Sequence, residues 1–474
     1  MPRRTTRLTA IAVAGLLSVL APVAPMAAAQ PLPAPSGDSM ATPPPLPPGT
    51  APPQDTGKPD LAYAPKTQCV RSLNEGVVLP NKPWGQNQLR FDELHRFATG
   101  KGQTVAVIDT GVNRHDFLGD RLVGGGDYVT DKNGLEDCDG HGTEVAGIIA
   151  ASPPPGIGFK GIAPDARIIS IRQSSANYEG TPPPTPDNPN PNPRTAGTLS
   201  TLAQAVVRAA ELVPGGVINM SVDNCRPASF GRILPAELEL QAALRFAVED
   251  RNVVPVSSAG NLSENGCPNQ NNGPDASRPT TIVTPPWFSD YVISVAAMEE
   301  NGDPAQFSVQ GPWVSVAAPG TQIISLDPAT PSGLANRLVT KDNKLSAIQG
   351  TSFAAPYVAG MAALIRERFP NLTAKQVMNR IKATALHPAA TGGRDNLVGY
   401  GMINPIGALT AMIPSEQGIT PDPPINIPFT MPPPTPRDWT PMTVALLGSA
   451  GGVGLLLITL FIVHTVRRNR REAG

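Results

Sequence analysis

Three residues of the chain, Asp109, His141 and Ser352, are of the types that together cleave an acyl bond by nucleophilic attack. A serine hydroxyl is a weak nucleophile unless an imidazole accepts its proton, and the imidazole needs a carboxylate that fixes its tautomer. Taken singly, the three have simpler interpretations, as a turn residue, a structural histidine and a helix cap. The chemistry therefore depends on whether the elements that carry them converge.

The surrounding elements predict that the three residues do converge. Residues 104–111 (TVAVIDTG) form a short apolar run, typical of a central parallel strand, and Asp109 lies near its end. His141 lies at the start of a predicted helix (GTEVAGIIA), and Ser352 at the start of another over 351–369. Because chemistry in parallel α/β sheets gathers at the carboxyl ends of the strands, we expect the three at one edge.

The rest of the central region also alternates between predicted strands and predicted helices. Further strands are predicted at 166–173, 217–222 and 252–261, and further helices at 198–212 and 236–250. Thr198 or Ser200 is placed to cap the first of these helices. Repeated strand–helix–strand units predict an α/β fold, a parallel sheet with helices on both faces.

The motif sequences resemble the signature segments of subtilisin-like serine proteases, the subtilases. The resembling segments are VAVIDTG, DGHGTEVAG, VINMS, SSAGN and GTSFAAPYVAGMAAL, spread over about residues 84–412. The chain order Asp, His, Ser is also that of this family. The resemblance implies a subtilisin-like fold and a serine endopeptidase whose triad is Asp109, His141 and Ser352. A lipase or esterase is excluded, because no G-x-S-x-G surrounds Ser352.

The resemblance also implies further site residues. Asn261, which closes SSAGN, matches the family's oxyanion-hole asparagine, and its NH2 group would act with the backbone N–H of Ser352. The substrate crevice would be lined by two short segments, Ser221, Val222 and Asp223, and Ser258, Ala259 and Gly260. Subtilisins commonly have Ser-Leu-Gly-Gly where this chain has SVDN, so we expect Asp223 and Asn224 to narrow or polarise that wall.

A proline-rich insertion, about 174–194, follows the second predicted strand. Subtilases usually supply there an edge segment that pairs with the substrate backbone. Because proline has no N–H donor, we expect the insertion to lie over the substrate cleft and limit access instead of extending a sheet. An exposed, functionally neutral loop is the alternative.

The two ends of the chain predict export and a membrane anchor. Residues 1–29 have the basic, apolar and A-x-A parts of a signal peptide. The mature chain then comprises a proline-rich extension (30–80), the catalytic domain (81–412), a proline-rich stalk (413–440), a transmembrane helix (441–464) and a basic tail (465–474). The arginines of that tail place it in the cytoplasm, and the catalytic domain outside a membrane that the chain crosses once.

This layout resembles the mycosins, the membrane-anchored subtilases of type VII secretion systems. The resemblance implies a secreted protein substrate and, as a partner, the secretion membrane complex. It also implies that the segment before Trp84 wraps the domain instead of acting as a removable inhibitor. The alternative is a structural component that stabilises the secretion complex and whose proteolysis is dispensable.

The four cysteines predict two disulfides in an exported chain. Cys225 and Cys267 each follow a predicted strand by a few residues, so neighbouring strands would bring them together at one sheet edge. Elimination then pairs Cys69 with Cys138, although four cysteines allow three connectivities. The second bridge would pin the extension to the active-site face.

Composition excludes other classes of function. The chain has 37 basic and 38 acidic residues, a net charge of −1, which gives no electrostatic case for nucleic acid. The cysteines lack C-x-x-C spacing, so we expect no zinc site, and no cofactor is called for. Clustered aspartates match no calcium loop: Asp127, Asp131, Asp137 and Asp139. No metal ligands are therefore assigned, and whether calcium is bound stays open.

Overall fold

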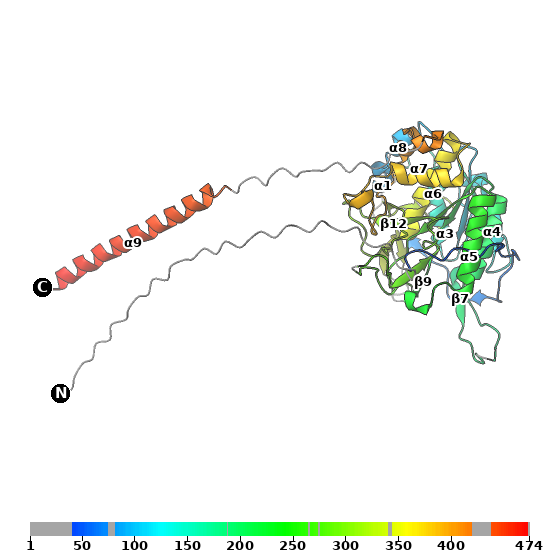
Figure 1. The fold of residues 1–474 in the computed structure, drawn as a ribbon, viewed down its shortest axis with the longest axis horizontal. Helices are drawn as coiled ribbons and strands as arrows, with labels where there is room; N and C mark the ends of the chain where they lie inside the picture. The colour runs from blue at the N-terminus through cyan, green and yellow to red at the C-terminus, as the bar shows by residue number, and fades with distance from the viewer. Residues whose placement is uncertain are drawn as a thin grey trace. The chain divides into compact units, whose positions relative to one another are not determined.

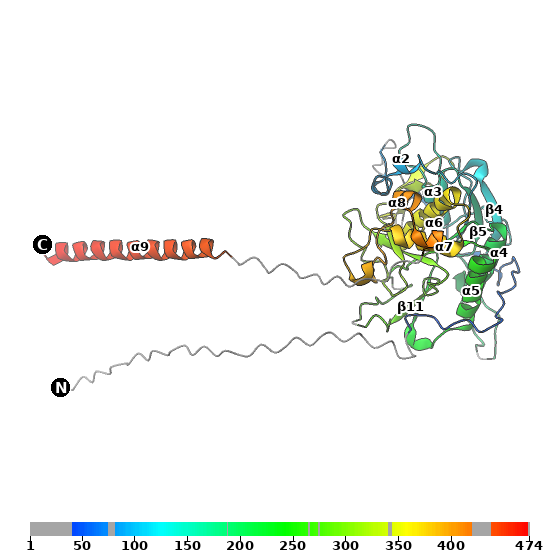
Figure 2. The ribbon, with the colours of Figure 1, turned by 45° about the horizontal axis from the view of Figure 1, so that its top comes forward.

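The structure, a computed structural model, describes residues 40–73, 81–186, 188–263, 266–273, 275–339, 344–419 and 438–472. The predicted signal peptide and most of the predicted stalk lie outside these residues. The chain divides into two units, one up to Ile419 and one from Thr420 (Figures 1 and 2).

A sheet of seven parallel strands forms the centre of the first unit. Its spatial order is β13-β12-β10-β8-β3-β5-β4. The strands are β3 (Thr104–Asp109), β4 (Leu122–Asp127), β5 (Arg167–Arg172), β8 (Val217–Met220), β10 (Val254–Ser258), β12 (Ile293–Met298) and β13 (Val316–Pro319). After β3 the chain forms β4 and β5 on one side of β3. It then forms β8, β10, β12 and β13 on the other side. Asp109 ends β3 beside this switch in direction, where ligand sites of such sheets lie.

Both faces of the sheet are buried, which explains the unbroken apolar run of β3. Val105 and Val107 pack into the core under α3 (His141–Ala150), α6 (Thr351–Arg368) and α7 (Ala374–Thr384). Ala106 and Ile108 point the other way, into the core under α4 (Leu199–Leu212) and α5 (Pro235–Arg245). Figure 1 shows α4 and α5 side by side on their face. The predicted parallel sheet covered on both faces is thus confirmed.

The predicted elements are present with small differences in their bounds. Thr198 caps α4 through a capping box with Thr201, which confirms one of the two predicted caps. The predicted helix 236–250 changes at Phe246–Asp250 into a π-helical turn. The prediction did not include β4, β12 or β13.

Residues 40–73 of the N-terminal extension lie along the first unit. Met40 O accepts a hydrogen bond from Trp287 Nε1 at 2.9 Å, and Asp55 accepts one from the Tyr128 hydroxyl at 2.6 Å. Further on, two short extension strands pair with the domain: β1 (Ala64–Pro65) with β6 (Ser175–Gly180), and β2 (Ser72–Leu73) with β16 (Arg337–Val339). The part of the extension that is described therefore wraps the domain.

The expectation that the 174–194 insertion cannot extend a sheet is wrong for its first part. Residues 175–180 contain no proline, and as β6 they pair with both β1 and β7 (Arg194–Ala196). The prolines lie between β6 and β7, in a loop that Figure 1 shows extending beyond β7, apart from the helices. Control of access to the cleft by that loop stays a prediction.

The remaining elements connect and cover this framework. They are α1 (Trp84–Gln88), α2 (Phe91–Leu94), α8 (Pro405–Thr410), β9 (Asn224–Pro227), β11 (Thr281–Thr284), β14 (Ser325–Leu326), β15 (Leu334–Ala335) and β17 (Leu345–Ala347).

The second unit contains α9 (Thr440–Glu472). Within Thr440–Arg471 the most apolar 18-residue window has a mean hydropathy of 2.3, and this is the one helix among the described residues long and apolar enough to cross a membrane. The predicted span 441–464 lies within it, followed by four arginines.

Candidate active site

Asp109 and His141 form a hydrogen-bonded pair at the carboxyl end of the sheet. His141 Nδ1 donates to Asp109 Oδ1 at 2.7 Å, and the carboxylate is fully buried while the imidazole remains partly exposed. The close approach of α3 to β3 depends on Gly142, because a Cβ there would lie 2.0 Å from Gly111 O. The carboxylate fixes the imidazole tautomer with Nε2 free to accept a proton.

The loop before His141 is held by Asp137, whose role the sequence did not reveal. Its buried carboxylate accepts hydrogen bonds from the Thr110 hydroxyl (2.8 Å), Gly140 N–H (2.7 Å), Thr143 N–H (2.8 Å) and the Thr143 hydroxyl (2.7 Å). Burial raises the pKa of Asp137 to about 6, although these hydrogen bonds lower it. Asp137 thus ties the residue after Asp109 to the start of α3.

Ser352 is the second residue of α6 and lies close to His141. The ring of the next residue, Phe353, packs on the imidazole with centroids 5.0 Å apart. The side chains of Ser352 and His141 do not form a hydrogen bond here, and without bound substrate such bonds are often long. The Ser352 carbonyl accepts a hydrogen bond from Ser221 Oγ at 2.7 Å, which fixes the helix start against the end of β8.

Asn261 is oriented by a backbone donor of α6. Its Oδ1 accepts hydrogen bonds from Thr351 N–H at 2.9 Å and from the Thr351 hydroxyl at 3.2 Å. A backbone N–H only donates, so the atom facing it must be the amide oxygen. The NH2 group of Asn261 is then directed away from Thr351 and remains available as a donor. The sequence does not reveal this anchor, because it joins residues 90 positions apart.

The electrostatics around His141 favour its protonated form. Burial lowers the pKa of His141, but the charge of Asp109 and its hydrogen bond raise it, and the balance is a pKa raised to about 9. Burial also raises the pKa of Glu144 well above its usual range. Asp109 is the carboxylate with the largest effect on the pKa of His141, so it is the main anion that stabilises an imidazolium formed there.

One wall of the predicted crevice borders a pocket of about 270 Å³. Val222, Asp223 and Asn224 line it together with residues just after β5 and residues of β7 and α4, among them Gln173, Leu199 and Leu202. Burial raises the pKa of Asp223 to about 6, although the charge of His141 and the Ser258 hydroxyl lower it.

The second predicted crevice segment lies deeper. Ser258 and Ala259 are fully buried at the end of β10. Gly260 N–H donates to Thr351 Oγ1 at 3.2 Å, so this segment is fixed against the start of α6. Contact of Ser258, Ala259 and Gly260 with a substrate stays a prediction.

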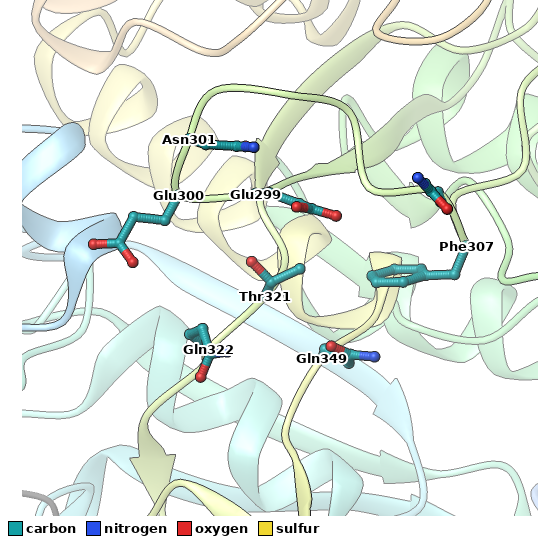
Figure 3. Close-up of a pocket in the computed structure, with 8 residues that line it drawn as sticks. Glu299, Glu300, Asn301, Phe307, Thr321, Gln322 and Gln349 are labelled. Atoms are coloured by element: carbon teal, nitrogen blue, oxygen red, sulfur yellow. The ribbon is translucent and has the colours of Figure 1, made fainter.

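Another pocket, of about 560 Å³, lies at the ends of β12 and β13, on the other side of Asn261 from β8. Figure 3 shows Glu300 and Gln322 at one end of it and Phe307 and Gln349 at the other. Gln349 is three residues before Ser352, and Phe307 O accepts a hydrogen bond from Leu262 N–H, next to Asn261, at 2.7 Å. The catalytic candidates therefore lie between two pockets.

Both predicted disulfides are confirmed. The bridges join Cys69 to Cys138 and Cys225 to Cys267. Beside the first bridge, Val70 N–H donates to Cys138 O at 2.8 Å. A Cβ on Gly140, whose φ is 83°, would lie 2.5 Å from Val70 Cγ1, so the extension packs directly on the residue before His141.

Two of the other clustered aspartates also have internal roles. Asp127 accepts hydrogen bonds from the backbone of residues 129 and 130 and lies 3.7 Å from buried Arg172. Asp139 accepts a hydrogen bond from Ala176 N–H in β6 at 2.8 Å. These contacts hold both carboxylates within the fold.

Comparison with known proteins gives one family. The model of the subtilase family matches residues 100–401. Mycosin-1 of Mycobacterium tuberculosis is 42% identical over 425 residues, which cover 87% of this chain and 92% of that protein. Mycosin-4 of the same organism is 43% identical over 375 residues, covering 78% and 79%.

Comparison with solved structures gives the same family. Crystalline MycP1 from Mycobacterium smegmatis superposes with a TM-score of 0.70 and 39% identity, covering 83% of this chain and 99% of that one. A chain of the intact ESX-5 inner membrane complex superposes with a TM-score of 0.72 and 38% identity, covering 90% and 100%. The chain therefore belongs to the subtilase family of serine endopeptidases and, within it, to the mycosins.

Proposed function

We propose that this endopeptidase cleaves secreted protein substrates through an acyl-enzyme formed on Ser352. His141 Nε2 accepts the proton of Ser352 Oγ as the oxygen attacks the scissile carbonyl carbon. The oxyanion of the tetrahedral intermediate accepts hydrogen bonds from the Asn261 NH2 group and Ser352 N–H. His141 returns the proton to the departing amine, and a water molecule then releases the acyl group by the same route. The observation that carries this proposal is the 2.7 Å Asp109–His141 hydrogen bond beside Ser352.

Two related solved structures support a second part of the proposal. MycP1 is described as an essential component of the type VII (ESX-1) secretion system, and another similar chain was solved within the ESX-5 inner membrane complex. This chain would associate with such a complex and process a substrate that the system exports. Stabilisation of the complex is a second function, because similarity extends over 90% of the chain to that complex component.

The anchor sets the topology of this proposal. The apolar stretch of α9 is followed by four arginines, which favours a cytoplasmic C-terminus and a catalytic domain outside the membrane. Protease added to spheroplasts should remove the domain and spare a C-terminal tag. A protected catalytic domain would show that the orientation is reversed.

One strain comparison separates the two functions. Wild type, a Ser352→Ala strain and a deletion strain are scored separately for substrate processing and for export. Loss of processing with retained export in the point mutant, and loss of both in the deletion, would support both functions. If the point mutant and the deletion lose export equally, the structural function is wrong. Continued processing by the point mutant would refute the catalytic one.

A further inference from the structure

Asp223 occupies a fixed position between the catalytic residues and the pocket of about 270 Å³. Two residues before it, Ser221 Oγ is hydrogen-bonded to the carbonyl of Ser352. Immediately after it, Asn224 begins β9 and pairs with Thr284 of β11. Cys225 is bridged to Cys267, and the Asp223 carboxylate lies within 4.8 Å of both sulfur atoms. The backbone on both sides of Asp223 is therefore held, which fixes where its side chain leaves the main chain.

Among the described residues, the Asp223 carboxylate also has no permanent cationic partner. Asp223 is half-buried, and among the described residues His141 is the charged group that lowers its pKa. His141 must be neutral to act as the base and is charged only after it accepts a proton, so it cannot balance Asp223 throughout the reaction. Next to Asp223, the fully buried Ser258 hydroxyl also lowers the pKa of Asp223, but a hydroxyl carries no charge. A half-buried carboxylate with only a neutral hydroxyl beside it is costly unless a cationic donor arrives from outside.

We infer that Asp223 is a specificity-determining residue. It selects substrates with a lysine or arginine side chain that enters the pocket of about 270 Å³ lined by Asp223. The cationic group would donate to the Asp223 carboxylate, and its apolar stem would lie against Val222 and Leu202 in the same pocket. An acidic substrate residue at this place would be repelled. This inference rests on the proposed proteolysis and adds the class of substrate to it.

The test uses the full chain in detergent micelles and a peptide library in which each position near the scissile bond is varied. Wild type should prefer Lys or Arg at one position, and Asp223→Asn should lower kcat/KM for those peptides by roughly 10–100-fold, the loss expected for one charge-assisted hydrogen bond. Neutral peptides should be affected much less. Asp223→Lys should reverse the preference toward Asp or Glu. Asp120→Asn removes one negative charge from an exposed 3₁₀ turn and serves as the control.

Each outcome decides one question. If wild type cleaves peptides but shows no basic preference at any position, the inference is wrong even though the protease function stands. It is also wrong if Asp223→Asn reduces cleavage of all peptides equally, since this would indicate a purely steric or structural wall. If both Asp223 variants fail to fold, the preference of the wild-type enzyme for Lys or Arg in the peptide library still tests the inference. If wild type cleaves no peptide while Ser352 fails to react with an acylating probe, it is the proposed function that has failed.

Discussion

Thr351 N–H donates to Asn261 Oδ1 at 2.9 Å, and this single hydrogen bond determines which end of the Asn261 amide faces the reaction centre. The same α6 start supplies Ser352 and, in the proposed mechanism, its N–H as the second oxyanion donor. The proposed nucleophile lies on α6 and the proposed oxyanion donor Asn261 is hydrogen-bonded to the start of that helix, which is the kind of fixed arrangement that preorganised stabilisation requires.

Replacing Asn261 should therefore reduce turnover without loosening the fold. Asn261→Ala is expected to lower kcat by about 10²–10³-fold, which is the cost of removing one such donor in subtilisin. Asn261→Asp is the sharper variant, because a carboxylate still accepts from Thr351 N–H but offers no donor to the oxyanion. Steady-state kinetics should show KM changed little in both. If the Asn261→Asp variant keeps the kcat of the wild type, Asn261 does not belong to the oxyanion hole.

The pKa of His141 predicts an alkaline activity profile. The base must be neutral, and the folded-state pKa is raised from 6.5 to about 9, so kcat/KM should increase as the pH rises through that range. Below it, kcat/KM should fall about tenfold per pH unit. Asp109→Asn removes the charge that raises the pKa, so the residual activity should titrate at lower pH and be reduced by about 10⁴-fold, as in serine protease triads. An unchanged apparent pKa in Asp109→Asn would contradict this account.

Asp137 should matter for activity although it does not touch the nucleophile. In Asp137→Asn one amide NH2 must face an N–H or O–H donor, so at least one of the four hydrogen bonds is lost. We expect the free energy of unfolding to fall by about 1–3 kcal/mol and kcat/KM by more than tenfold as His141 loses its fixed position. Asp131→Asn is the matched control, because Asp131 is exposed with a φ of 56° that asparagine tolerates. Equal behaviour of the two variants would refute the role of Asp137.

The Cys69–Cys138 bridge should stabilise the domain through its extension. The double variant Cys69→Ser/Cys138→Ser opens a loop of 69 residues and should lower the free energy of unfolding by roughly 2–4 kcal/mol, measured by urea denaturation. Limited proteolysis should then cut within residues 40–73, because their remaining contacts are short strands, hydrogen bonds and solvent-accessible ion pairs. An unchanged urea midpoint and an uncut extension would show that the bridge is not needed to hold it.

The sequence predicted the parts of the fold that depend on local pattern. The run ending at Asp109 is apolar on both faces because two helical layers cover it, and such runs are visible without a structure. The motif segments likewise predicted which residues to examine at the site. β12 and β13 are equally apolar and could have been found by the same criterion.

Features set by distant partners were not predictable in this way. The glycine-rich β4 and the polar β6 have weak strand propensity and become strands because β5 and β1 pair with them. The Asp137 hydrogen bonds and the Thr351–Asn261 anchor join segments that only the fold brings together. The sequence contains the residues but not these contacts.

Covalent labelling of the nucleophile tests the central claim most directly. The full chain in detergent is treated with a fluorophosphonate, which reacts with activated serine hydroxyls, and the modified peptide is mapped by mass spectrometry. The account predicts one adduct on Ser352, none in Ser352→Ala, and strongly reduced labelling in His141→Ala, with peptide cleavage lost in parallel. Cleavage by Ser352→Ala, or an adduct on another serine of an active enzyme, would contradict it.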